Sequence, residues 1–318
     1  MAQIVIDVSS HQNPAAFDFT ELKKHISGAI LRAGRTYWGT GSSYGKDEQF
    51  EAFYKACKQH GIPVGAYWYS CADTTAEAMA EADKCFEWGL RGKQFELPIY
   101  WDTEDEHHQR KAAKGQLTRV AKAFLERLES RGYYVGIYAS ASWLNSKLDM
   151  DTLKDYDVWV AHYGVSKPAY NRPYGLWQYS STTRIAGYNG DLDASYMYKD
   201  YPAIIKAVGL NGWPRQAVKP TGQKQAAGQV KEGNMLKNKN VMVCYKNDGD
   251  YANAIALLNG LVGLCKTATL IKGDNPFNGF YTIQVGGAAI KGADKVLTGK
   301  DRREVLINIG KFLDEVAK

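Results

Sequence analysis

Residues 97–104 read LPIYWDTE, a short apolar run that ends in two carboxylates. A run rich in Ile, Tyr and Trp predicts a strand over 97–103. Side chains two residues apart on a strand point to the same face, with Cα atoms roughly 6.6 Å apart. We therefore expect Asp102 and Glu104 to project together from the C-terminal end of this strand.

Neighbouring carboxylates hinder each other's ionisation, which raises the pKa of one of them and supplies a general acid near neutral pH. Cleavage of a glycosidic bond needs such a group. The alternative is that the acidic run at 102–106 is a solvated loop. Two more strand-end carboxylates favour a site: Asp7 closes the run IVID, and Asp193 follows the last predicted strand. Adjacent first and last strands would bring both to the same rim as Asp102 and Glu104, although a single Asp there is more often a cap.

Similar strand-like runs recur through the first 200 residues and alternate with segments of helical spacing. The other predicted strands are 3–9, 28–34, 62–70, 133–139, 157–163 and 175–180, and the predicted helices are 47–60, 74–90 and 115–131. This alternation is typical of a parallel α/β sheet with right-handed crossovers. Seven or eight strands in about 210 residues favour a barrel. Little helix is expected between 157 and 200, so the barrel should be irregular at its end.

The chain divides by composition after Trp213. All eight Trp lie in residues 1–213, which carry 24 Lys+Arg against 25 Asp+Glu, whereas residues 214–318 carry 16 against 9. Residues 214–240 hold six of those basic residues and one acidic residue, with no aromatic, which predicts a basic flexible linker. Strands at 241–247, 268–271 and 281–285 and helices at 250–262 and 300–316 predict a small α/β domain over 241–318, near the lower size for independent folding.

Composition excludes several classes of protein. Hydrophobic residues make up 45% of the 318 residues and charged residues 23%, as in an ordinary globular protein and unlike a disordered or collagen-like one. Five Cys without paired spacing indicate reduced thiols, and no run approaches the ~20 apolar residues of a membrane span. The carboxylates and histidines at 104–108 lack metal-ligand spacing, so we expect no metal and no cofactor. The scattered lysines of the linker do not predict nucleic-acid binding.

Six short motifs follow one another along the chain, and their order is more specific than any one of them: DVSSHQ at 7–12, GAYWY at 65–69, DTE at 102–104, WVAHY at 159–163, WQY at 177–179 and LD at 192–193. This set resembles the glycoside hydrolase family 25 lysozymes, muramidases common among phage endolysins, over residues 1–210. The resemblance implies a (β/α)5(β)3 barrel that cuts the β-1,4 bond between N-acetylmuramic acid and N-acetylglucosamine in peptidoglycan. It makes Glu104 the general acid and places Asp102, Asp7 and Asp193 around it. Ala194 and Ser195 depart from the family pattern, so Asp191 competes for the last acidic position.

Substrate assistance fits two carboxylates on the same strand, because both lie beside the sugar and neither faces the opposite side for attack. The 2-acetamido oxygen would attack the anomeric carbon while Asp102 orients it. Aromatic side chains supply stacking faces for sugars, with core packing as the alternative for about half of them. Predicted substrate-binding residues are Tyr67 and Tyr138, which match the family's −1 site, with Tyr69, Trp159, Trp177 and Arg35. Arg35 alternatively pairs with an acid.

The C-terminal motifs YKNDGDYANA and VGG resemble the wall-binding domain of some clostridial phage endolysins, and more distantly wall-binding repeats of clostridial surface proteins. This implies recognition of a wall polymer and self-association. The sequence KEGNM at 231–235 suggests an internal start that yields a free fragment from Met235; an ordinary methionine or autoproteolysis are the alternatives. No signal peptide is recognised, so we expect synthesis in a host cytoplasm and release to the wall with a holin. A non-catalytic wall-binding lectin or adhesin is the alternative function.

Overall fold

The computed structural model describes residues 3–37, 42–214, 236, 239–245, 253–254, 257, 261, 267–272, 281–286, 293–299 and 302–316. The chain forms two compact units, residues 1–206 with 210–213 and residues 207–209 with 214–318. Of the predicted linker at 214–240, only residues 214, 236, 239 and 240 are described, and Met235 lies outside the described residues. The three predicted domain ranges therefore stay predictions.

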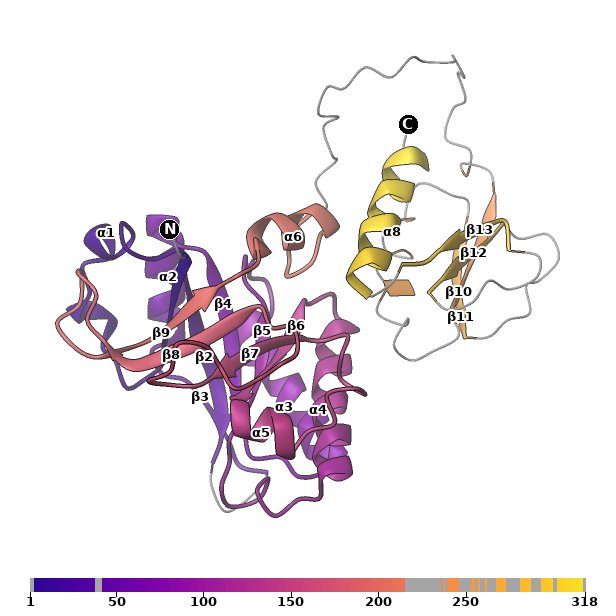
Figure 1. The fold of residues 1–318 in the computed structure, drawn as a ribbon. Coiled ribbons are helices and arrows are strands. Elements are labelled where there is room, and N and C mark those ends of the chain that lie inside the picture. The colour runs from indigo at the N-terminus through magenta and orange to yellow at the C-terminus, as the bar shows by residue number, and fades with distance from the viewer. Residues whose placement is uncertain are drawn as a thin grey trace. The chain divides into compact units, whose positions relative to one another are not determined.

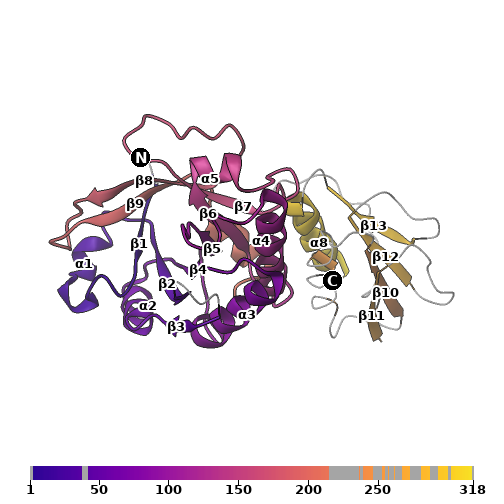
Figure 2. The ribbon, with the colours of Figure 1, turned by 90° about the horizontal axis from the view of Figure 1, so that it is seen from below.

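Eight strands of the first unit close into a barrel (Figures 1 and 2). In order around the barrel they are β1 (Gln3–Val8), β2 (Gly28–Thr36), β4 (Val64–Ser70), β5 (Ile99–Thr103), β6 (Val135–Ser140), β7 (Asp157–Ala161), β8 (Leu176–Thr183) and β9 (Leu192–Met197). Parallel pairing runs from β1 to β8, and β9 closes the ring antiparallel to both β8 and β1. The short β3 (Tyr44–Lys46) pairs with the end of β2. The predicted irregular (β/α)5(β)3 barrel is confirmed.

Helices lie on the outer side of the ring of strands, beside the strands of its first part (Figure 2). They are α1 (Phe19–Leu22), α2 (Phe50–His60), α3 (Thr75–Cys85), α4 (Lys114–Glu129) and α5 (Ala141–Ser146), with a 3-10 turn at Pro14–Ala16 and a π-helical turn at Phe86–Leu90. The helices predicted at 47–60, 74–90 and 115–131 are confirmed as α2, α3 with its π-helical turn, and α4. Helix α5 and helix α6 (Tyr201–Val208) were not predicted because each is too short to show a helical period.

Local sequence explains where the long helices form. On α4, Leu117, Val120, Phe124 and Leu128 recur at helical spacing and are all buried against the barrel wall. Helix α3 begins at a capping box in which Thr74 accepts from the Glu77 amide and Glu77 accepts from the Thr74 amide. Two side-chain layers result, one between strands and helices and one inside the barrel.

Strand β9 was not predicted either. Its sequence LDASYM is short and contains a charged residue and small ones, so its alternation is weak, although Leu192, Ala194 and Met197 are buried. Asp193 therefore lies near the beginning of an antiparallel strand and does not follow the end of a parallel one. Because antiparallel strands run in the opposite sense, this position still lies at the rim where the parallel strands end.

The second unit contains a parallel sheet in the order β11-β10-β12-β13. Its strands are β10 (Asn240–Tyr245), β11 (Thr267–Lys272), β12 (Tyr281–Val285) and β13 (Lys295–Leu297), and it includes the helix α8 (Arg302–Val316). Val305, Ile309, Phe312 and Val316 of α8 share one apolar core with residues of β10 and β12. The predicted small α/β layer is confirmed. Of the helix predicted at 250–262, residues 253, 254 and 257 are helical and the others, apart from Leu261, lie outside the described residues.

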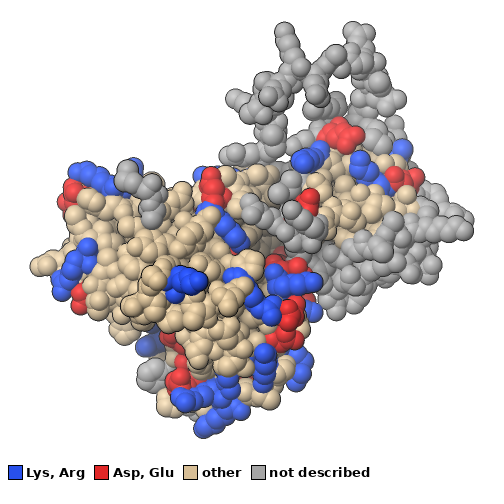
Figure 3. Space-filling view, in the orientation of Figure 1, with Lys and Arg blue, Asp and Glu red and all other residues tan. Residues whose placement is uncertain are grey.

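Charged side chains of both signs are interspersed over the face of the first unit seen in Figure 3. This agrees with the near balance of acidic and basic residues over 1–213. Among the described residues, no helix is both long enough and apolar enough to cross a membrane.

Candidate active site

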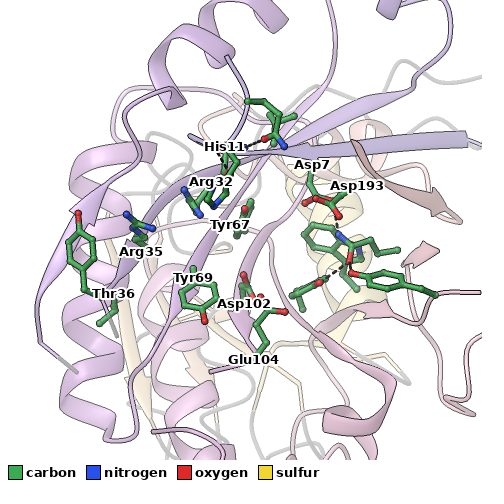
Figure 4. A pocket seen from close by; sticks show the side chains of 18 residues that line it. Asp7, His11, Arg32, Arg35, Thr36, Tyr67, Tyr69, Asp102, Glu104 and Asp193 are labelled. Atoms are coloured by element: carbon green, nitrogen blue, oxygen red, sulfur yellow. Dashed lines mark hydrogen bonds between the residues drawn. The ribbon is translucent and has the colours of Figure 1, made fainter. Parts of the chain in front are cut away.

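A cavity of about 620 Å³ opens at the rim where the parallel strands of the barrel end. Parallel barrels concentrate functional side chains at this end, because the loops after the strands meet there. Eighteen residues line it: Asp7, Val8, Ser9, His11, Gln12, Arg32, Arg35, Thr36, Tyr37, Tyr67, Tyr69, Asp102, Glu104, Tyr138, Trp159, Tyr163, Gln178 and Asp193. Figure 4 shows ten of these labelled, with the carboxylates on one side of the cavity and the arginines on the other.

Strand register brings the four carboxylates together. Asp102 is the fourth of the five residues of β5, and Glu104 follows the strand's last residue. Asp7 of β1 and Asp193 of β9 are direct cross-strand partners. Asp102 and Asp7 are buried, Asp193 is half-buried, and Glu104 is exposed at the mouth of the cavity. The pairing of Asp102 with Glu104 and of Asp7 with Asp193, expected from the sequence, is what the fold provides.

The two deepest carboxylates are difficult to ionise. Burial raises the pKa of Asp102 well above its usual value, and the negative charges of Glu104 and Asp7 raise it further, whereas Arg32 opposes them. Burial also raises the pKa of Asp7, as does the charge of Asp193, while a hydrogen bond from Gln178 lowers it. Each carboxylate thus penalises the ionisation of the next, so the pKa values of the cluster are raised together.

Glu104 and Asp193 stand nearer to solvent. Desolvation by the cavity walls raises the pKa of Glu104, and the charge of Asp193 raises it further. Burial raises the pKa of Asp193 to about 6. A carboxylic acid that keeps its proton close to neutral pH at an open cavity mouth can act as a general acid.

A chain of hydrogen bonds orients Asp7. The hydroxyls of Tyr138 and Tyr163 both donate to Gln178 Oε1, at 2.7 and 2.6 Å. This fixes the amide of Gln178 with its nitrogen toward Asp7, where Nε2 donates to Oδ2 at 2.8 Å. The arrangement stabilises the ionised form of Asp7 and no other carboxylate of the cluster.

Asp102 has a buried carboxylate oxygen, Oδ1, that accepts no hydrogen bond from the described residues. A buried acceptor without a donor costs about 1–3 kcal/mol, so such atoms usually meet a ligand or water. Because the oxygen belongs to a residue that lines the cavity, a donor on a bound molecule can satisfy it.

Nine of the eleven residues predicted for the site line this one cavity. They are Asp7, Asp102, Glu104, Asp193, Tyr67, Tyr69, Tyr138, Trp159 and Arg35. Trp159 is fully buried beneath it, with its indole Nε1 donating to Ser195 Oγ at 2.9 Å and its ring against Tyr138. It forms part of the packed barrel interior below the cavity.

The structure does not bring Trp177 and Asp191 to the cavity. Trp177 precedes Gln178 on β8, and since Gln178 points inward, Trp177 points to the outer core layer, where it packs on Tyr196 and donates to the His162 carbonyl at 2.8 Å. Asp191 is exposed and forms an ion pair with Arg184 at 2.9 Å. Asp193, and not Asp191, is therefore the acidic residue from this segment that reaches the cavity.

Two residues that sequence reasoning gave no role also shape the cavity. Gln178 orients Asp7, and Arg32 is buried and forms an ion pair with Asp47 at 2.8 Å. Gln178 lay within the quoted motif WQY, and alternation after Trp177 could have indicated that it faces inward. Arg32 lies in the middle of a predicted strand, where a charged residue between apolar ones was a signal for a buried ion pair.

No group of three or more His, Cys, Asp or Glu side chains within the described ranges is arranged to hold a metal ion. Around the predicted acid, Asp105 accepts hydrogen bonds from the backbone amides of His108 and Gln109, and Glu106 pairs with Arg110. These residues build the turn that follows β5.

Known proteins resemble this chain in sequence and in fold. The chain is 28% identical to "Autolytic lysozyme" of Clostridium acetobutylicum over 191 residues, 59% of this chain and 53% of that protein. It is 32% identical to "Lysozyme M1" of Streptomyces globisporus over 169 residues, 48% of this chain and 55% of that protein. The chain thus spans about half the length of these curated relatives. The crystal structure of the CTP1L endolysin shares the fold with a TM-score of 0.53 at 19% identity, covering 98% of this chain and 99% of that one.

The family model for glycosyl hydrolases family 25 matches residues 6–188, more than half of the chain. This range includes the strands that carry Asp7, Asp102 and Gln178, together with the segment that holds Glu104. The chain belongs to glycosyl hydrolases family 25.

Proposed function

We propose that this protein is a lysozyme that hydrolyses the β-1,4 bond between N-acetylmuramic acid and N-acetylglucosamine in bacterial peptidoglycan. Membership of the family and the lysozyme names of its relatives support this activity. The observation that carries the mechanism is the buried Oδ1 of Asp102, which has no hydrogen-bond partner among the described residues and belongs to the same cavity as Glu104 at its mouth. A sugar with a 2-acetamido group supplies the N–H donor that this oxygen lacks.

Glu104 acts as the general acid in this mechanism. The acetamido oxygen of N-acetylmuramic acid attacks its own anomeric carbon, the glycosidic C–O bond breaks, and Glu104 gives its proton to the leaving oxygen. Asp102 accepts the acetamido N–H and stabilises the positive charge that develops on the resulting ring. Water then attacks the anomeric carbon, and Glu104, now ionised, takes its proton. The sugar keeps its original configuration.

Other cavity residues support this step. Gln178 donates a hydrogen bond to Asp7 and so favours its ionised form, whose negative charge would stabilise the positive charge that develops on the sugar. Asp193 raises the pKa of Glu104 and so helps the acid to keep its proton. Tyr67 and Tyr138 line the cavity between the two deep carboxylates and offer aromatic faces to the sugar rings.

The release of reducing ends from purified peptidoglycan tests the proposal. Wild-type protein should release N-acetylmuramic acid reducing ends, identified as muramitol after borohydride reduction, and Glu104→Gln should lower the rate by at least about 100-fold. Glu106→Gln is the matched control, because Glu106 is two residues away, exposed, and paired with Arg110. Release of N-acetylglucosamine reducing ends, or full activity of Glu104→Gln, would contradict the proposal. Wall binding without new reducing ends would support a non-catalytic wall-binding protein instead.

We further propose that the protein serves as a phage endolysin, made in the host cytoplasm and released to the wall with a holin. The shared fold of an endolysin along the whole chain supports this role. Residues 241–318 would then bind a wall polymer, and tethering them to the hydrolase would raise its local concentration on the substrate. The proposed role requires neither binding to nucleic acid nor insertion into a membrane.

Self-association through the C-terminal domain, including a free fragment from Met235, is part of the same proposal. A domain of this size gains stability from a partner. Silent recoding of residues 231–233, together with a change of the Met235 codon, should abolish the short fragment, seen as a separate band when extracts of expressing cells are run on a gel. Persistence of the band would point to proteolysis.

A further inference from the structure

The cavity has a cationic end that the proposed hydrolysis does not use. Arg32 and Arg35 of β2 line it with His11, across from the four carboxylates (Figure 4). Tyr67 and Tyr69 lie between the two ends in the same view. A glycan lying along the cavity would therefore meet opposite charges at its two ends.

A β-bulge places both arginines in the cavity. Residues three apart on a regular strand point to opposite faces, so Arg32 and Arg35 would normally be separated. The register between β2 and β4 shifts after Arg32: Arg32 pairs with Tyr67 and Arg35 with Tyr69, which leaves Ala33 as the extra residue. Because Tyr67 and Tyr69 share the inner face, so do Arg32 and Arg35.

The bulge is fixed by close packing. A Cβ on Gly34 would lie 2.4 Å from Trp68 Cζ3 and 2.7 Å from the Gly45 carbonyl oxygen, so only glycine fits there. The position of Arg35 is therefore set by the strand and does not depend on a loose surface loop.

The two arginines differ in their partners. Arg32 donates to Asp47 Oδ2 at 2.8 Å and to Ser10 Oγ at 2.7 Å, so its charge is neutralised within the protein. Arg35 has no carboxylate within ion-pair distance among the residues that the structure describes, although it lines the same cavity as the four carboxylates. Its guanidinium lies 4.8 Å from the centre of the Tyr37 ring, and none of its N–H donors is bonded to a side chain of the described residues, so they can bind an anion. The sequence-based alternative that Arg35 pairs with an acid is not what the described residues show.

The spacing separates Arg35 from the bond-breaking groups. Arg35 pairs with Tyr69, and Tyr69 pairs with Asp102, so the arginine is two strands away from Asp102 in one row. At a strand separation of about 4.8 Å this is roughly 10 Å, longer than one sugar ring. A cation at this distance does not contact the bond that breaks, but it can contact a charged substituent of the same glycan.

We propose that Arg35, supported by Tyr37, forms a subsite for a carboxylate carried by the glycan substrate. The inference rests on the proposed function, since it concerns how that substrate is selected. Peptidoglycan carries carboxylates on its stem peptides, and on the lactyl groups of N-acetylmuramic acid where the peptide has been removed. A planar guanidinium with free donors suits a carboxylate in a two-point contact. A chitin-type glycan has neither group, so the subsite favours peptidoglycan over uncharged glycans.

Binding to soluble glycans, measured by calorimetry at low salt in the inactive Glu104→Gln protein, tests this proposal. Three ligands are compared: peptide-bearing muroglycan, the same glycan freed of peptide by an amidase, and the peptide-free glycan with its carboxylates converted to methyl esters. Arg35→Gln should weaken binding of a carboxylate-bearing glycan by about tenfold and of the methyl ester by less than twofold. Arg35→Lys should recover part of the loss. Arg119→Gln, which removes an exposed charge on α4, should change none of the three affinities.

The outcomes are separable. A loss confined to the peptide-bearing glycan assigns the stem peptide, and a loss confined to the peptide-free glycan assigns the lactyl group; both support the subsite. Equal effects of Arg35→Gln on the charged and esterified glycans, or none on any of them, overturn it. Failure of the wild-type protein to release reducing ends would remove the proposed hydrolysis while leaving a charge-dependent Arg35 effect intact.

Discussion

Gln178 is the residue whose removal should reveal most clearly how the carboxylate cluster is held. Gln178→Met keeps the approximate side-chain volume but deletes three hydrogen bonds, from Tyr138, from Tyr163 and to Asp7. Tyr163 is 46% exposed, so water replaces its lost partner. Tyr138 is 7% exposed, and leaving its hydroxyl unsatisfied costs about 1–3 kcal/mol.

The bond to Asp7 adds a part that depends on pH. A hydrogen bond to a charged group contributes about 1.5–3 kcal/mol, and it stabilises folded protein only while Asp7 is ionised. Burial already raises the pKa of Asp7 in the folded state above its unfolded value, and the substitution raises it further. The variant should therefore lose more unfolding free energy at pH 8 than at pH 4, by up to about 1.5–3 kcal/mol, because more of Asp7 is ionised at the higher pH. The part that comes from Tyr138 should be the same at both pH values.

Urea unfolding followed by tryptophan fluorescence measures this difference, because all eight Trp lie within residues 1–213. Gln116→Met is the matched control: its Nε2 donates to the Asp73 carbonyl at 2.8 Å, away from any cavity carboxylate, so its smaller effect should not change with pH. A loss for Gln178→Met that is equal at pH 4 and pH 8 would refute the role of Gln178 in favouring the ionised form of Asp7.

Three further substitutions test other parts of the first unit. Arg32→Met leaves Asp47 buried without its cation and should cost about 3–5 kcal/mol in urea unfolding. Asp47 also accepts hydrogen bonds from the Ser10 and Gln49 amides, so the double variant with Asp47→Asn, which removes the charge and keeps an acceptor, should restore part of this loss; no recovery would show that the unpaired charge is not its cause. Asp193→Asn removes a charge that raises the pKa of Glu104, so the alkaline limb of the kcat/KM profile should move to lower pH, and an unmoved limb would contradict this coupling. Burial raises the pKa of Glu81 to about 7, so the folded state binds this proton more tightly than the unfolded state does. The contribution of Glu81 to the free energy of unfolding of the wild-type protein should therefore fall by about 3 kcal/mol between pH 4 and pH 8. Glu81→Gln should abolish that pH-dependent fall in urea unfolding; an unchanged slope would show that other groups cause it.

The carboxylate pair was predictable from the sequence because the period of a strand is fixed. Asp102 and Glu104 are two residues apart, and nothing beyond strand geometry is needed to place them together. Helix α4 was predictable for the same kind of reason, since four buried apolar residues repeat along one face. Asp7 and Asp193 required the additional assumption that the first and last strands are neighbours, which closure of the barrel provides.

Other features depend on contacts that no local pattern encodes. The extra residue Ala33 in β2 becomes visible only in the pairing with β4, so the sequence could not show that Arg32 joins Arg35 on the inner face. Trp177 was expected at the cavity because aromatic residues near strand ends often bind sugars, but the neighbouring Gln178 takes the inward position. Asp191 lies just before β9, where it is exposed and forms an ion pair with Arg184.

In the proposed mechanism the buried Oδ1 of Asp102, which lacks a partner in the described part of the chain, orients the acetamido group of the substrate, which then attacks its own anomeric carbon. The configuration of the first product reveals whether this attack takes place. Proton NMR of a fresh digest of soluble peptidoglycan strands should show the new reducing end initially as the β-anomer, with the α-anomer appearing only as the sugar equilibrates. An initial α-anomer would mean direct attack by water and would contradict the account.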